Sequence, residues 1–247
     1  GKSNGGGVAS YISSIIPILE EKNKIIRIKS MTDLNIFKRL FDFTIAILQV
    51  LFFSISRKNK VAHIHMASRW SFKRKSLLIK ILKFRKIPII LHLHGAEFHI
   101  FFEKESSPEI KRNITDTFLA CDEIIALSNS WAKWIKENIK HPSINMVFNG
   151  SKDYLIKDDL VSDRENILLF MGRIGERKGI FDLIESLNTL NSKFQNFKLI
   201  IAGDGEIIKA KELVTKYNLE DKIMFTGWIG EEQKIELLNK SKVFILP

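Results

Sequence analysis

The chain has 247 residues, of which 45% are hydrophobic and 27% are charged. This length exceeds the usual size of one domain, and the hydrophobic content can supply two cores, which excludes a disordered or low-complexity protein. The single cysteine, Cys121, excludes an internal disulfide framework and is typical of a reducing cytosol. We therefore expect a cytoplasmic globular protein of two domains.

The net charge of +11 is concentrated in the first 150 residues, which hold 24 Lys and Arg against 12 Asp and Glu. The remaining residues hold 15 against 16. The densest run, residues 69–86, carries no acid. One explanation of this run is a solvated helix face. The other is contact with an anionic membrane or lipid-linked substrate, where each clustered cation adds about 1 kcal/mol of favourable binding free energy. Nucleic acid is not expected as a partner, because no recognition motif accompanies the charge.

Apolar runs rich in Ile and Val alternate with helical patterns along the whole chain, which predicts parallel sheets with helices on both faces. The expected strands are Ile25–Ile28, Val61–His65, Pro88–Leu93, Glu123–Leu127, Asn145–Phe148, Ile167–Met171, Phe197–Ala202, Ile223–Phe225 and Val243–Leu246. Helices are expected to begin near Val8, Leu34, Phe72, Glu109, Ser130, Lys178, Glu206 and Glu231.

The stretch from Phe41 to Ser56 imitates a membrane span. Its uncharged core of about 14 residues is shorter than the 18 to 20 that a spanning helix needs, so we expect a buried or interfacial helix. Together with the basic run, this helix suggests peripheral attachment to the inner face of a membrane.

A polar, acidic segment at residues 149–166 has little periodic structure and predicts a linker. The expected domains are therefore residues 1–150 and 151–247, each a doubly wound parallel sheet. Because ligands of such sheets bind beyond the carboxyl ends of the strands, the loops after each strand are the places to search for chemistry.

Gly1, Lys2 and Ser3 imitate the end of a phosphate-binding P-loop. A P-loop passes directly into a helix, whereas Gly5, Gly6 and Gly7 disfavour helix by about 1 kcal/mol each. We interpret these three glycines as a loop whose backbone can approach a ligand, followed by a helix N-terminus aimed at it. The P-loop alternative would require ATP or GTP hydrolysis that depends on Lys2.

In the second domain, "FMGRIGERKG" places Arg173 and Lys178 between the end of a strand and the start of a helix at Gly179. Two cations and the first amides of a helix form a favourable diphosphate site. The alternative is two solvated surface cations, which is common for either residue alone.

Two further strand ends give weaker signals. Gly203 and Gly205 follow a strand in "LIIAGDGE" and suggest a tight turn or one wall of a nucleotide pocket, since the dinucleotide-binding glycine spacing is incomplete. Trp228, in "FTGWIG", follows the next strand and could meet a flat base.

Four histidines lie on two strands of the first domain. His63 and His65 occur in "AHIHM", and His92 and His94 occur in "ILHLHG". The H-x-H pairs lack a Cys set or an H-E-x-x-H helix, so we expect no metal. We assign His63 and His92 a structural role, and His94, at the end of its strand, a role in substrate contact or proton handling.

The motifs "GGGVASYI", "HLHGAEF", "MVFNGSKD", "FMGRIGERKGIFDLIESL", "LIIAGDGE" and "FTGWIG", in this order, resemble those of group 1 glycosyltransferases. These are retaining enzymes of the GT-B fold, in which two Rossmann-like domains face each other across a cleft. The nearest likeness within the family is to transferases of bacterial envelope or capsular polysaccharide.

The resemblance implies transfer of a sugar from a nucleoside diphosphate sugar, bound mainly by the second domain, to a glycan or lipid-linked acceptor. It assigns Arg173 and Lys178 to the departing diphosphate, and His94 to the transferred sugar and acceptor. It assigns residues 5–7 to the donor phosphates and residues 149–150 to an interdomain motif. No cofactor beyond the donor is implied.

The family also has a Glu-rich donor loop that would begin near Pro247, so we expect a fragment with weak or absent activity of its own. Two alternatives remain open. One is a nucleotide-sugar epimerase of similar architecture, which needs no acceptor. The other is a non-catalytic nucleotide-binding subunit of a polysaccharide assembly complex.

Overall fold

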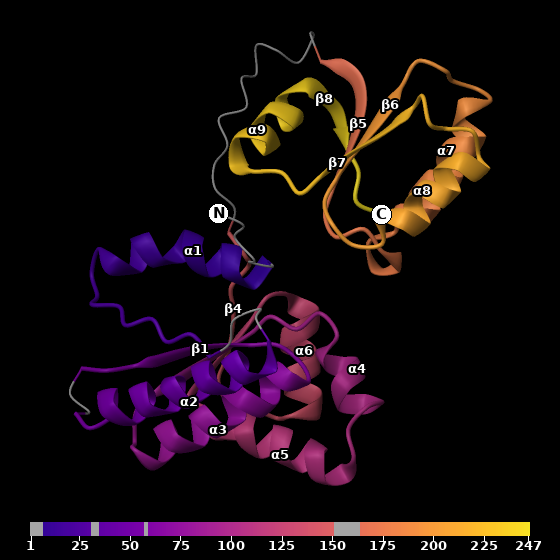
Figure 1. Cartoon of the computed structure of the whole chain (residues 1–247). Helices are drawn as coiled ribbons and strands as arrows, with labels where there is room; N and C mark the ends of the chain where they lie inside the picture. The colour runs from indigo at the N-terminus through magenta and orange to yellow at the C-terminus, as the bar shows by residue number, and fades with distance from the viewer. Residues whose placement is uncertain (1–6, 31–34, 57–58, 151–163) are drawn as a thin grey trace. The chain divides into compact units, whose positions relative to one another are not determined.

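The computed structural model describes residues 7–30, 35–56, 59–150 and 164–247 (Figure 1). The chain divides into two compact units, residues 1–152 and 153–247. Each unit contains one four-stranded sheet with all neighbouring strands parallel. The expected α/β class with two Rossmann-like sheets is therefore confirmed. The cleft between two facing domains stays a prediction, and each unit is described by itself.

The described elements of the first unit are α1 (Gly7–Glu20), α2 (Ile36–Phe53), β1 (Ala62–Met66), α3 (Trp70–Phe84), β2 (Ile89–Leu93), α4 (Phe98–Glu103), α5 (Pro108–Leu119), β3 (Glu123–Ala126), α6 (Asn129–Asn138) and β4 (Ile144–Met146). The strands follow one another across the sheet in the order β1-β2-β3-β4. Each is joined to the next by a helical connection, as parallel pairing requires.

The two faces of the first sheet differ in chemistry. His65 of β1 is paired in register with His92 of β2, so these imidazoles project from the same face. The residues between them along each strand, such as Ile64 and Leu91, point to the other face and enter the main core. Since β1 and α3 are in contact, α3 covers that apolar face. The sheet thus separates an apolar core from a histidine-rich surface.

Local capping fixes where several helices begin. The side chain of Asn35 accepts a hydrogen bond from the amide of Lys38 at the start of α2. Ser107 accepts one from the amide of Ile110 in α5, and Ser128 caps α6 in the same way. Such caps satisfy amides that have no partner within the helix, each stabilising it by about 1 kcal/mol.

Helix α2 contains most of the stretch that imitates a membrane span. Within the described residues, no helix is long and apolar enough to cross a membrane. Only Ala46 and Val50 of α2 are buried. A large part of its apolar surface is exposed, including Phe37 at 79% and Phe52 at 68% exposure. The expectation of a helix that does not span is confirmed, but most of this helix is not buried.

The described elements of the second unit are β5 (Glu165–Met171), η2 (Glu176–Lys178), α7 (Ile180–Asn191), β6 (Lys198–Ala202), α8 (Ile207–Lys216), β7 (Ile223–Gly227), α9 (Glu231–Lys240) and β8 (Ser241–Phe244). The strand order is β7-β6-β5-β8. Figure 1 shows α7 and α8 together on one face of this sheet and α9 on the other. Fully buried Phe170, Ile184 and Leu199 lie in the core between the sheet and α7.

The expected helix starts are confirmed to within two residues, including α1, whose first residue is Gly7 rather than Val8. Gly7 is therefore helical and not part of the loop, while Gly5 and Gly6 lie outside the described residues. The strand expected at Ile25–Ile28 is wrong, because residues 24–30 form neither helix nor strand. Ile28 is partly buried against the core but is not part of a β-sheet. The apolar pattern therefore reflected packing and not a strand. The short helix α4 was not expected.

Candidate functional site

In the second unit, the loops that follow β5, β6 and β7 are hydrogen-bonded to one another. The amide of Gly172 donates to the carbonyl of Ala202 over 3.0 Å, and the amide of Ile174 donates to Asp204 over 2.7 Å. On the other side, the amide of Gly203 donates to the Gly227 carbonyl over 2.8 Å. The carboxyl ends of three adjacent strands therefore form one connected surface, at the edge where ligands of parallel sheets bind.

Gly203 and Gly205 make this connection sterically feasible. Both have positive φ angles, 153° and 128°. A Cβ atom on Gly203 would lie 1.9 Å from the carbonyl oxygen of Gly172, and one on Gly205 would lie 2.3 Å from that of Ile174. Any side chain at these positions would push the loops apart. A packing role accounts for both glycines, and their contact with a nucleotide stays a prediction.

Arg173 and Lys178 lie in the loop that joins β5 to α7. Arg173 is exposed and Lys178 is half-buried, and neither side chain makes an ion pair or hydrogen bond with another described residue. The acid between them, Glu176, is paired with Lys209 at 2.6 Å. The loop therefore presents two cations that its own acid does not neutralise.

The start of α7 adds a second favourable element to the same loop. Its N-cap is Gly179, at φ 63°, which has no side chain to accept hydrogen bonds from the first amides. Those amides carry the positive end of the helix dipole and favour an anion nearby. Trp228, beyond β7, is 61% exposed and leaves a flat aromatic surface accessible. These features can bind a diphosphate and stack on a base.

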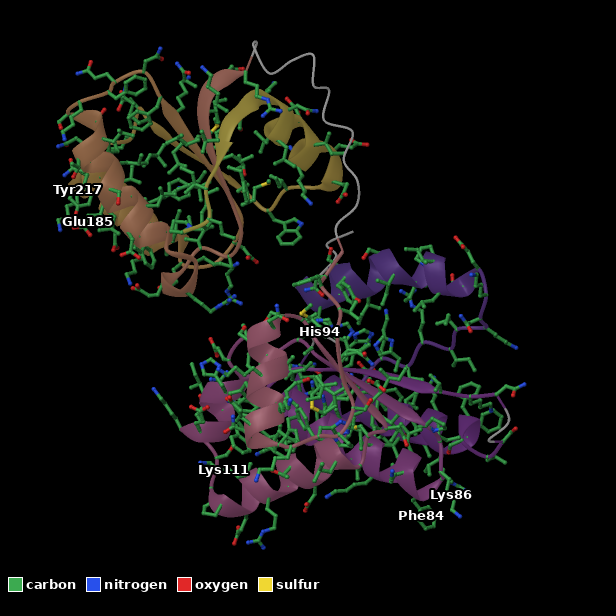
Figure 2. The ribbon with its side chains drawn as sticks, turned by 180° about the vertical axis from the view of Figure 1, so that it is seen from behind. Phe84, Lys86, His94, Lys111, Glu185 and Tyr217 are labelled. Carbon is green, nitrogen blue, oxygen red and sulfur yellow. The ribbon has the colours of Figure 1, made fainter. Side chains whose placement is uncertain are left out.

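In the first unit, the four histidines form one cluster along one face of β1 and β2, with His94 just beyond the carboxyl end of β2. Nδ1 of His65 lies 2.8 Å from Nε2 of His94, and Nε2 of His63 lies 3.3 Å from Nδ1 of His92. The rings of His92 and His94 stack with centroids 4.1 Å apart. Figure 2 labels His94 at the rim of this unit. His94 is thus held in place by its neighbours rather than free to swing.

Tyr11 of α1 belongs to this cluster and was missed by sequence reasoning. Its ring lies 5.2 Å from that of His92 and 5.3 Å from that of His94, centroid to centroid. Burial raises the pKa of its hydroxyl. The glycine run indicated a role for the amino end of this helix, whereas Tyr11, which contacts the histidines, lies one turn further along α1. No pattern in the sequence distinguishes Tyr11 from an ordinary helix residue.

Burial keeps these imidazoles neutral at physiological pH. It lowers the pKa of His65 to about 2, of His92 to about 3 and of His94 to about 4, and neighbouring histidines lower all three further. A neutral ring has one donor and one acceptor nitrogen. His94 can therefore orient a hydroxyl by hydrogen bonding, but it is a weak base for removing a proton.

Ring nitrogens of His63, His65 and His92 lie within 4.8 Å of one another, close enough for a metal ion to be considered. Two features oppose a cation there. The described groups that act on His65 are the other histidines and Lys75, whose positive charge would repel an ion. No carboxylate is among them, although ligand histidines usually donate to one or to a carbonyl. The expectation of no metal stays a prediction.

Asn149 and Gly150 follow β4 and are exposed, so they lie in neither cluster. Gly7 is exposed at the start of α1, and a Cβ there would meet nothing within 4 Å. The structure therefore places Gly203 and Gly205 against the loop that contains Arg173. It places His94 with three histidines and Tyr11.

A family model described as "Glycosyl transferases group 1" matches residues 151–247, the part of the chain that carries the Arg173 loop. One curated relative is a GalNAc transferase of Campylobacter jejuni that acts on an undecaprenol-linked diphosphate glycan. It is 27% identical over 162 residues, which are 65% of this chain and 43% of that protein. An uncharacterised glycosyltransferase of Methanocaldococcus jannaschii is 35% identical over 80 residues, which are 32% of this chain and 19% of that protein.

The chain spans less than half of the length of these curated relatives. Among solved structures, WaaG, a glycosyltransferase involved in lipopolysaccharide biosynthesis, has a TM-score of 0.64 at 12% identity. It covers 98% of this chain, which in turn covers 71% of WaaG. Alr3699/HepE of Anabaena, in complex with UDP and glucose, has a TM-score of 0.61 at 15% identity and coverages of 92% and 62%. These likenesses confirm the GT-B fold.

Proposed function

We propose that the protein is a group 1 glycosyltransferase that transfers a sugar from a nucleoside diphosphate sugar to a glycan or lipid-linked acceptor, because a family model of that description matches its second unit. The observation that carries the proposal is the family match over the unit that presents Arg173 and Lys178. The pathway we propose is polysaccharide or cell-envelope biosynthesis in the cytoplasm, with retention at the anomeric carbon. The donor is a substrate, and no further cofactor takes part.

The second unit supplies the chemistry for departure of the diphosphate. Negative charge develops on the leaving oxygen as the bond to the sugar breaks, and fixed cations and amides stabilise that charge without reorganising. Arg173 can grip two phosphate oxygens, Lys178 adds a point charge, and the uncapped start of α7 adds amide donors. We propose that the exposed Trp228 stacks on the base.

The first unit supplies a rigid contact for the acceptor or the transferred sugar. Stacking on His92 and the contact with His65 fix the His94 ring, so it can position a hydroxyl with little loss of freedom. We propose that His94 orients the substrate rather than acting as a strong base, in accord with its lowered pKa. We propose that Gly5 and Gly6 approach the donor phosphates, whereas Gly7 belongs to α1.

Calorimetric titration of UDP, GDP and ADP into the chain tests the donor site. UDP comes first, since the similar Alr3699/HepE structure holds it. We expect one diphosphate to bind, and the Arg173→Ala/Lys178→Ala variant to bind it at least tenfold more weakly. Lys193→Ala/Lys198→Ala is the matched control, because it removes two exposed cations next to the amino end of β6. Equal binding by both variants would refute the assignment.

Product analysis separates the alternatives. A transferase consumes donor only when an acceptor is present, an epimerase converts the donor alone, and a non-catalytic subunit binds without turnover. Conversion of the donor without an acceptor would contradict the transferase assignment.

Peripheral attachment to an anionic membrane is also part of the proposal. The exposed apolar side chains of α2 and the exposed cations Lys73, Lys80 and Lys83 of α3 support it. We expect the chain to sediment with vesicles containing 30% or so of an anionic phospholipid at low salt, and less at high salt, because salt screens exposed charges. Indifference to such vesicles at low salt would refute attachment.

A further inference from the structure

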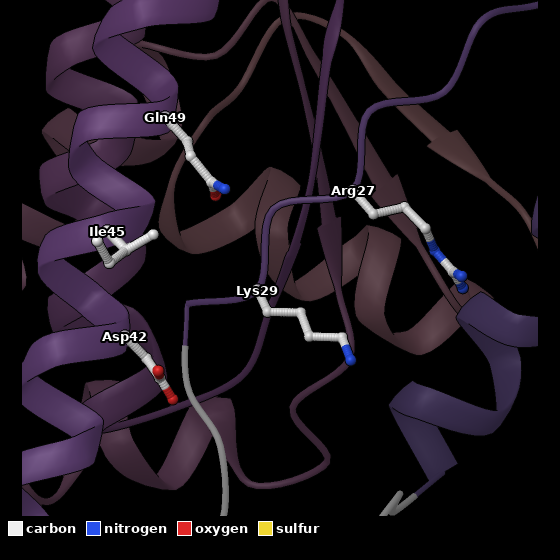
Figure 3. A pocket seen from close by; sticks show the side chains of 5 residues that line it. All are labelled: Arg27, Lys29, Asp42, Ile45 and Gln49. Atoms are coloured by element: carbon white, nitrogen blue, oxygen red, sulfur yellow. The ribbon is translucent and has the colours of Figure 1, made fainter.

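A pocket of about 280 Å³ lies in the first unit between α2 and the segment 24–30 (Figure 3). Arg27 and Lys29 line it from the segment, and Asp42, Ile45 and Gln49 line it from α2. The two cations alternate along the extended segment, so both project to the same side, as Figure 3 shows. This pocket is separate from the His94 cluster, since the two share no lining residue.

The charge around this pocket is positive. Neither Arg27 nor Lys29 makes an ion pair or hydrogen bond with another described residue, and Asp42 is the only acid among the lining residues. Nearby, α2 packs against α3, and the charges of Arg39 and Arg74 act on each other across that contact. Nε of Arg74 is buried without a hydrogen-bond partner. Arg39 lies one turn before Asp42 on α2, so this contact adds positive charge near the pocket.

An exposed apolar stripe lies directly beside the pocket on the same helix. Phe41, Leu48 and Phe52 are 64%, 55% and 68% exposed. Successive residues of an α-helix are rotated by about 100°, so these three positions fall within about 40° of one another and next to Ile45. Ile45 belongs to both surfaces, because it lines the pocket and is 38% exposed. The stripe extends about 16 Å along α2.

We propose that this pocket binds the phosphate or diphosphate group of a lipid-linked acceptor, with its hydrocarbon chain along the stripe of Phe41, Leu48 and Phe52. The ligand has to be anionic to compensate Arg27 and Lys29. It has to be apolar next to the phosphate, because the stripe begins at the rim of the pocket. The inference rests on the proposed transferase function, for which it names the class of acceptor.

The test is calorimetric binding of three probes below their critical micelle concentrations: farnesyl diphosphate, inorganic diphosphate and farnesol. We expect farnesyl diphosphate to bind at least tenfold more tightly than either half alone. Arg27→Gln/Lys29→Gln should weaken it at least tenfold, and Phe41→Ser should weaken it while leaving inorganic diphosphate unchanged. Arg112→Gln/Lys136→Gln is the matched control, because it removes an exposed Arg and an exposed Lys from α5 and α6.

Binding of inorganic diphosphate as tight as that of farnesyl diphosphate would overturn the lipid part of the inference. Unchanged binding by Arg27→Gln/Lys29→Gln would overturn the pocket. Since all altered residues are exposed, circular dichroism is expected to confirm that each variant folds. UDP binding is measured on the same samples. If the unaltered chain binds UDP but does not bind farnesyl diphosphate, the inference alone fails, whereas absence of UDP binding that depends on Arg173 and Lys178 fails the proposed function.

Discussion

Acidification should destabilise the first unit selectively, because its buried histidines are neutral in the folded state. His92 is fully buried, and burial together with His94 and His63 lowers its pKa to about 3, whereas an unfolded histidine titrates near 6.5. Between these values the unfolded chain binds more protons than the folded one, so stability falls as pH falls below about 6.5. Above pH 6.5 both states are neutral and the effect vanishes.

The magnitude follows from the same two values. pH 5.0 lies about 1.5 units below the pKa of His92 in the unfolded chain, so His92 binds a proton there while the folded form stays neutral. This difference lowers the free energy of unfolding by about 2 kcal/mol. His65 and His94 act in the same direction, and their partial exposure reduces what each adds. A loss of this size is a large fraction of the 5 to 15 kcal/mol by which a typical protein is stable.

Hydrogen exchange measured by mass spectrometry can follow each unit separately. Peptides over β2 should lose protection between pH 7.5 and 5.0, after correction for the intrinsic pH dependence of exchange. Peptides over β6 provide an internal control, because all six histidines precede residue 142 and the second unit has none. If β2 lost no more protection than β6, the neutral buried state of the cluster would be wrong.

Three further predictions address packing and metal dependence. Gly203→Ala should destabilise the second unit by roughly 3 kcal/mol or more in urea unfolding, since the added Cβ would overlap the Gly172 carbonyl. The control Gly230→Ala should cost under about 1 kcal/mol, because an added Cβ there would have no atom within 4 Å. Phe98→Ala should cost about 3 to 5 kcal/mol in the first unit, because the ring is fully buried, and a loss below about 1 kcal/mol would contradict its core position. Diphosphate binding should be unchanged by a chelator such as EDTA, and a tenfold loss that zinc restores would show that a metal takes part.

Strand and helix order could be predicted from the sequence because buried parallel strands are nearly continuous apolar runs. β2 and β6 are examples, since almost every residue in each is buried. The segment Ile25–Ile28 shows where this reasoning fails. Only Ile28 of its isoleucines packs against the core, while Ile26 is 45% exposed. A strand also needs a neighbour to pair with, and periodicity carries no information about that neighbour. The helix α4 was not predicted because its six residues are too few for helical periodicity to be visible.

The candidate site was predictable in part. Loops after strands could be located from strand ends, so Arg173, Lys178 and His94 were identified from position alone. The contacts among these loops could not be foreseen, because they depend on register between strands far apart in sequence. The close approach of Gly203 to Gly172 is such a contact. Tyr11 reaches the histidines only through the packing of α1. The Arg27 pocket likewise forms where an irregular segment passes α2.

The uneven charge of the chain supports an anion on the first unit that is distinct from the donor. The proposed diphosphate cations Arg173 and Lys178 belong to the second unit, where acids and bases nearly balance. The first 150 residues hold 24 cations against 12 acids, and this excess raises the self-repulsion of the folded state. The proposed donor binding by the second unit would leave that repulsion unrelieved. An anionic acceptor held at Arg27 and Lys29 would relieve it, so farnesyl diphosphate should raise the thermal stability of the first unit, and high salt should reduce that gain.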